Sequence, residues 1–84
     1  MVSLVDLENP DVTYSGQIFW DMVRPGVRLP VMGPAGCMTS VIRKVVELAK
    51  GKYYIQTRHS RYLLTRGRAA TPMEICAIPT VVGA

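Results

Sequence analysis

Apolar and polar residues alternate in the second half of the chain with the spacing of β-strands. The segments 52–57 and 61–65 are rich in aromatic and β-branched residues, and three residues, 58–60, separate them. Two such segments on either side of a short connection predict a β-hairpin. Because side chains alternate across a strand, we expect one face of this hairpin to pack in the core. The other face is expected to be a polar surface that carries Tyr54.

Residues 40–50 allow two interpretations. Their apolar positions recur with the spacing of an amphipathic helix, with Thr39 or Ser40 as a cap at its start and Gly51 at its end. Four of the apolar residues are β-branched, which favours a strand that leads through a short loop into the hairpin. We expect the strand, which gives a three-stranded meander. A helix at 40–50 packed on a hairpin is the alternative.

The residues before this central region predict shorter elements. Residues 12–24 predict one short helix, with Ser15 as its cap and with Trp20 in the aromatic part of the core. Residues 27–31 alternate and follow a Pro-Gly turn, so they are expected to form a strand. Pro30 lacks a backbone donor and places that strand at a sheet edge.

Length and composition predict one small domain over residues 1–84. Its 84 residues are 49% hydrophobic, which is enough for a modest core. We therefore expect a β-rich fold, either a small antiparallel meander or an SH3-like barrel with one short helix. Residues 73–78 are compatible with a last strand, and loose termini are expected at about 1–10 and 79–84.

The start of the chain has no basic region of a signal peptide, and no apolar run approaches the roughly 20 residues of a membrane span. A cytoplasmic protein without membrane contact is therefore expected. In a reducing compartment Cys37 and Cys76 are expected to be free thiols, and a bridge between them is left open.

Positive charge is concentrated in one part of the chain. The formal net charge is +4, and eight of the ten Lys and Arg residues lie within 39–68, together with one of the six acids. Segregated charge of this kind attracts anionic partners. The partner expected first is therefore an anion.

Tyrosines interleaved with arginines on a β surface are typical of small domains that bind nucleic acid or nucleotides. In such domains cations contact phosphate and rings stack on bases. We expect a non-catalytic basic β surface for nucleic acid, a nucleotide or another phosphate ligand. Its expected ligand-binding residues are Tyr54, Arg58, His59, Arg61, Tyr62, Arg66 and Arg68. Peripheral, salt-sensitive phosphate contacts are expected from Lys44, Lys50 and Lys52.

Catalytic, metal and cofactor chemistry have little support in the sequence. The glycine-containing stretch 33–40 lacks the lysine that a phosphate-binding loop needs. His59 is the only histidine, and Cys37 and Cys76 do not form the paired spacing of a zinc site. We expect no enzyme activity, no cofactor and no metal site.

A protein-interaction module is the alternative function. Exposed strands can pair with a partner or with another copy in a homo-oligomeric adaptor, and a basic face suits an acidic protein surface. Residues 39–41 (TSV) and 57–62 (TRHSRY) resemble small phage-encoded proteins, over about a third of the chain. The resemblance implies inhibition of a host protein or sequestration of a nucleotide signal, and it assigns no role to single residues.

Overall fold

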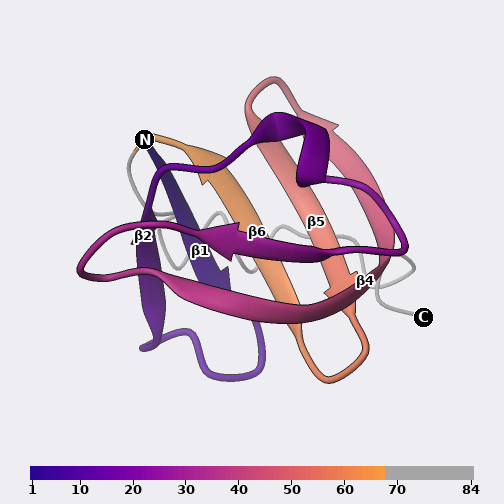
Figure 1. Cartoon of the computed structure of the whole chain (residues 1–84), viewed down its shortest axis with the longest axis horizontal. Helices are drawn as coiled ribbons and strands as arrows, with labels where there is room; N and C mark the ends of the chain where they lie inside the picture. Colours follow the sequence, from indigo (N-terminus) through magenta and orange to yellow (C-terminus); the bar gives the residue numbers. More distant parts are fainter. Residues whose placement is uncertain (68–84) are drawn as a thin grey trace.

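A computed structural model of the protein describes residues 1–67 and shows a β-rich fold that resembles a small SH3-like barrel (Figure 1). Within these residues, six antiparallel strands form a nearly closed sheet. The strands are β1 (Val2–Asp6), β2 (Thr13–Gly16), β3 (Arg28–Val31), β4 (Cys37–Ala49), β5 (Lys52–Thr57) and β6 (Arg61–Arg66). A three-residue 3-10 helix, η1 (Trp20–Met22), lies between β2 and β3.

The strands follow the order β2-β1-β6-β5-β4-β3, so β3 to β6 form a meander and the β1–β2 hairpin joins it through β6. The two end strands approach each other at a seam. There Gln17 and Met32 exchange both backbone hydrogen bonds, at 2.8 and 2.9 Å. Gly16 stands so close that a Cβ there would overlap the carbonyl oxygen of Met32. Backbone packing at this seam therefore brings the barrel close to closure.

The core lies inside this curved sheet and draws on five strands. Alternate residues of each strand point inward, as the two-residue period of a strand requires. The buried cluster consists of Val2, Leu4, Leu29, Val31, Ile42, Ile55, Tyr62 and Leu64. Burial of these side chains is the main favourable term that holds the barrel together.

Strand β4 settles the ambiguity at residues 40–50. It runs for 13 residues, pairs with β3 along its first part and with β5 along its second, and shifts register twice against β5. The strand prediction is confirmed, and the helical alternative is wrong. The β-branched residues decide the outcome, because they suit a pleated strand that wraps around the core. The bulges bend the strand, which lets it reach both partners.

The β5–β6 hairpin confirms the expected strands and turn, but its outer face differs from the prediction. Tyr54 and Leu63 are paired neighbours on the face opposite the core, and each is 1% exposed. Val5 of β1 lies on the same outer face and is also 1% exposed. The expectation of a polar surface carrying Tyr54 is wrong, because the hairpin is buried on both faces along its middle.

The first residues are an integral part of the sheet. Strand β1 pairs with β2 on one side and with β6 on the other. Leu4 has no exposed surface, and the hydroxyl of Ser3 donates a 2.7 Å hydrogen bond to the Gly67 carbonyl oxygen. The loose start expected at about residues 1–10 is therefore wrong for β1. Asp6 ends β1, yet the strand still lies between β2 and β6, because the side chains of Val2, Leu4 and Val5 are buried.

Residues 12–24 form no single helix. Ser15 lies in β2, and the helical part is limited to η1, where Trp20 is 38% exposed. Phe19 is 62% exposed, so this segment is not the aromatic end of the core. Strand β3 does form at the edge, as expected, and Pro30 lies opposite Met38 there.

Four predictions lie outside the described residues: the site residue Arg68, the strand at 73–78, the loose end at 79–84 and the state of Cys76. In the part of the chain that the structure does describe, no helix is long and apolar enough to cross a membrane.

Candidate ligand-binding surface

The predicted site residues do not form one surface, because they lie at two ends of the β5–β6 hairpin. Arg58 and His59 occupy the turn, whereas Arg66 lies where β6 ends (Figure 1). Arg61 and Arg66 are five residues apart on the same strand, which separates them by about 17 Å. We call the first region the turn end and the second the mouth.

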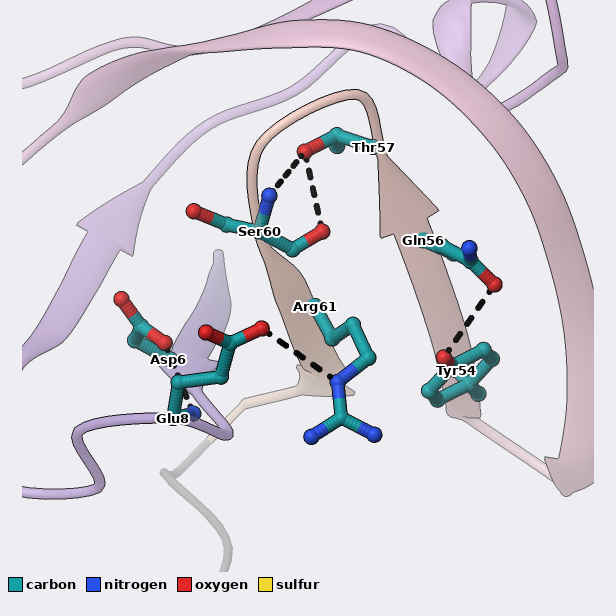
Figure 2. Close-up of polar contacts among 7 residues, drawn as sticks. All are labelled: Asp6, Glu8, Tyr54, Gln56, Thr57, Ser60 and Arg61. Carbon is teal, nitrogen blue, oxygen red and sulfur yellow. Dashed lines mark hydrogen bonds and ion pairs between the residues drawn. The ribbon is translucent and has the colours of Figure 1, made fainter. Parts of the chain in front are cut away.

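Two acidic residues lie near Arg61 at the turn end. The Arg61 Nε atom lies 3.4 Å from Glu8 Oε1, and the Asp6 carboxylate accepts a 2.9 Å hydrogen bond from the Glu8 backbone (Figure 2). The two partners of the ion pair are 40% and 56% exposed, so the pair itself stabilises little. Its effect is electrostatic, because Glu8, in the segment that follows β1, places negative charge beside Arg61.

Side-chain hydrogen bonds fix the shape of the turn. Thr57 Oγ1 accepts a 3.1 Å bond from the Ser60 N–H and donates a 3.0 Å bond to the Ser60 carbonyl (Figure 2). Ser40 of β4 donates to Thr57 Oγ1 at 2.8 Å and accepts from the His59 N–H at 3.1 Å. The turn end is therefore an ordered cap on the barrel, with Arg58 and His59 exposed on it.

Neither predicted stacking tyrosine is available at the surface. Tyr54 is 1% exposed, and its hydroxyl donates a 3.4 Å bond to Gln56 Oε1 (Figure 2). Tyr62 is 8% exposed and belongs to the core, where burial raises the pKa of its hydroxyl. The expectation that these two rings face a ligand from the surface is wrong.

Two other aromatic residues meet a cation at the mouth. The ring centroids of Trp20 and Tyr53 are 5.7 Å apart, with the planes tilted by 55°. The Arg66 guanidinium carbon lies 4.7 Å from the centroid of the Trp20 ring. Both distances are in the range of favourable aromatic and cation–π contacts. These contacts attach η1 to the end of the β5–β6 hairpin.

Strand register explains why these groups gather there. Tyr53 lies opposite Leu64 on β6 and opposite Glu47 on β4, and directly opposite residues share a face. Leu64 is in the core, so Tyr53 and Glu47 continue the inward face to the end of the sheet. Arg66 lies two residues beyond Leu64 and has the same orientation. The mouth is thus the open end of the inward face.

A hollow of about 540 Å³ opens at the mouth. Its size falls within the range of small-ligand sites. The lining residues are Glu47, Lys50, Gly51, Lys52, Tyr53, Thr65 and Arg66. Of the residues that the structure describes, three cations and one acid therefore border the hollow. A second, smaller hollow of about 130 Å³ shares Arg66 as a lining residue and is also lined by Trp20 and Ile18.

The sequence prediction identified part of the mouth. Arg66, Lys50 and Lys52 line the hollow, whereas Lys44 is exposed on β4 and does not. Trp20, Tyr53 and Glu47 were missed as site residues. Trp20 and Arg66 are 46 positions apart in the sequence, and only the folded chain brings them together. The alternation of β5 had already placed Tyr53 inward, which pointed to the core and not to a site.

Other candidate chemistry is sparse. Within residues 1–67, no three His, Cys, Asp or Glu side chains are close enough together to hold a metal ion. Cys37 is half-buried at the start of β4, and desolvation raises the pKa of its thiol. A raised pKa makes this thiol a poorer nucleophile near neutral pH.

Comparison with protein-family models, with curated proteins and with solved structures found no match to this chain.

Proposed function

We propose that this is a non-catalytic binding protein whose mouth holds a nucleotide or a stretch of single-stranded nucleic acid. One observation carries the proposal: Arg66 is held over the Trp20 ring, beside Tyr53, at the border of a hollow that two lysines also line. Aromatic faces and cations side by side are what such ligands need, because bases stack and phosphates attract positive charge.

The arrangement of Arg66 favours phosphate binding. Contact with Trp20 positions the Arg66 guanidinium, whose planar fork of five N–H donors matches the geometry of a phosphate. Among residues 1–67, no carboxylate forms an ion pair with Arg66, although Glu8 forms one with Arg61. An arginine held in place in this way loses less side-chain entropy when it binds a phosphate.

The test uses Trp20 as its reporter, because it is the only tryptophan of the chain. Short single-stranded DNA and RNA, and mononucleotides, are titrated while Trp20 emission is followed at low salt and at about 150 mM salt, where exposed charges are screened beyond roughly 8 Å. We expect saturable quenching at both salt concentrations. The proposal fails if binding disappears at the higher one.

Two variants of equal charge assign the site. Arg66→Ala should weaken binding by about tenfold, because a stacked, phosphate-contacting arginine is lost. Arg43→Ala removes the same charge from an exposed position on β4 that does not line the hollow, and should change affinity less than twofold. Equal effects of the two variants would mean that only overall charge matters.

Association with another protein, including a second copy of this chain, is the second candidate. It is favoured by Phe19, which is 62% exposed, and by Met38, which is 60% exposed. If the chain self-associates through such residues, light scattering should give a mass above 9.3 kDa that Phe19→Ser or Met38→Ser returns to the monomer. A monomer at all concentrations would remove the homo-oligomer from consideration. A nucleotide or nucleic-acid ligand agrees with the expected cytoplasmic location.

A further inference from the structure

Among the described residues, 1–67, Glu47 is the one acid that lines the mouth. It is exposed, and its position opposite Tyr53 on β4 places it on the inward side of the sheet, next to the ring on which a base would stack. Among residues 1–67, nothing forms an ion pair or a side-chain hydrogen bond with its carboxylate, although three cations border the same hollow. The exposed carboxylate is therefore not engaged by any of these described residues.

A carboxylate selects bases by the donors on their edges. It offers two acceptor oxygens side by side and no donor. Guanine is the one standard base whose Watson–Crick edge carries two neighbouring donors, the N1–H and the 2-amino group. Adenine, cytosine and uracil each place an acceptor next to their donor, so one carboxylate oxygen would face a lone pair.

We infer that the mouth selects guanine, with Glu47 accepting hydrogen bonds from N1–H and the 2-amino group. This inference rests on the proposed function, since it names the base that the same site takes. Tyr53 supplies the stacking face. Arg66 and Lys50, which line the same hollow, bind the phosphate. Glu47 therefore determines which base binds. Its negative charge weakens the attraction of the mouth for phosphate, and the two hydrogen bonds to guanine offset that loss.

A simpler role for Glu47 makes the opposite prediction. If the carboxylate only lowers the positive potential of the mouth, Glu47→Gln should raise affinity for every nucleotide by a similar factor. If it reads guanine, the same substitution should weaken binding of guanosine monophosphate relative to the others, because an amide offers only one oxygen. The ratio of affinities separates the two roles.

The experiment follows chemical shifts of the protein while guanosine, inosine, adenosine, cytidine and uridine monophosphates are added in turn. Inosine monophosphate keeps the N1–H and lacks the 2-amino group, so it isolates one of the two contacts. The wild-type protein should bind guanosine monophosphate about tenfold more tightly than the inosine nucleotide. In Glu47→Gln this preference should fall to less than about threefold. Glu8→Gln makes the same chemical change at the turn end and should keep the preference.

The outcomes distinguish the inference from the function on which it rests. If all five nucleotides bind equally, and Arg66→Ala weakens them all, the guanine inference is wrong and the proposed function stands. If none produces a saturable shift, the guanine inference is wrong, and the proposed function is wrong as well if short single-stranded DNA and RNA also fail to bind. If Glu47→Gln keeps the preference for guanine, another group must recognise the base, and the role inferred for Glu47 is wrong.

Discussion

The two ends of the β5–β6 hairpin carry similar charges but differ in what surrounds those charges. At the turn end, Arg61 has a carboxylate partner, and the aromatic residue of the same region, Tyr62, is buried. At the mouth, Arg66 has an aromatic partner, and a hollow lies beside it. The neighbours of a basic residue therefore decide whether it is a candidate for ligand binding. Counting cations in the sequence does not reveal those neighbours.

The largest expected difference between the two ends is structural. Trp20→Ala removes the contact with Arg66 and the contact with Tyr53, so the free energy of unfolding should fall by about 1–2 kcal/mol. His59→Ala at the turn end should change it by less than about 0.5 kcal/mol, because that side chain is exposed. Urea unfolding of both variants measures the difference. Equal losses would mean that the aromatic contacts at the mouth contribute nothing.

A smaller effect is expected from the ion pair at the turn end. A double-mutant cycle with Glu8→Gln and Arg61→Gln should give a coupling energy of about 0.2–1 kcal/mol, as is usual for exposed pairs. The coupling should shrink further in 0.5 M NaCl, since salt screens exposed charges. A coupling above this range, or one insensitive to salt, would show that the pair is more deeply held than its exposure indicates.

The smallest expected effect is a change of the free energy of unfolding with pH, caused by two partly or fully buried groups of the barrel. Burial raises the pKa of Cys37 above its ordinary value of 9.0 and that of Tyr62 above its ordinary value of 10.0. As pH rises past 9, the unfolded chain therefore releases these protons before the folded protein does. The free energy of unfolding should consequently decrease with rising pH.

Cys37→Ser provides the measurement for this effect. Urea midpoints at pH 8 and pH 10 should differ less in the variant than in the wild-type protein, because one of the two groups is gone. The same difference in both proteins would exclude a contribution from this thiol.

Local pattern was sufficient to predict the β-rich fold and most of its meander. β-Branched residues identified β4 despite its helical spacing, and the aromatic strands of the hairpin identified β5 and β6. The place of β1 between β2 and β6 could not be predicted, because it depends on pairing between residues some 60 positions apart. Such pairing leaves no local signal in a single sequence.

The candidate site was harder to predict than the fold for a related reason. Strand spacing alone already separates Arg61 from Arg66, and their odd separation places them on opposite faces. That information was in the sequence. Two features could not be derived from the sequence. One is the contact between Trp20 and Arg66, and the other is the burial of Tyr54 on the outer face of the hairpin. Both depend on which segments pack together, and a hairpin pattern does not determine that.

Gly16 has a consequence for how this chain can vary. At the seam, its lack of a side chain lets β2 approach the backbone of Met32. Every amino acid that can replace glycine by a single base change in its codon carries a Cβ, so no missense mutation at this position is conservative. Any substitution at the closing point of the barrel therefore forces the backbone to shift. The exposed side chain of His59, in contrast, can be replaced as long as its backbone N–H still donates to Ser40.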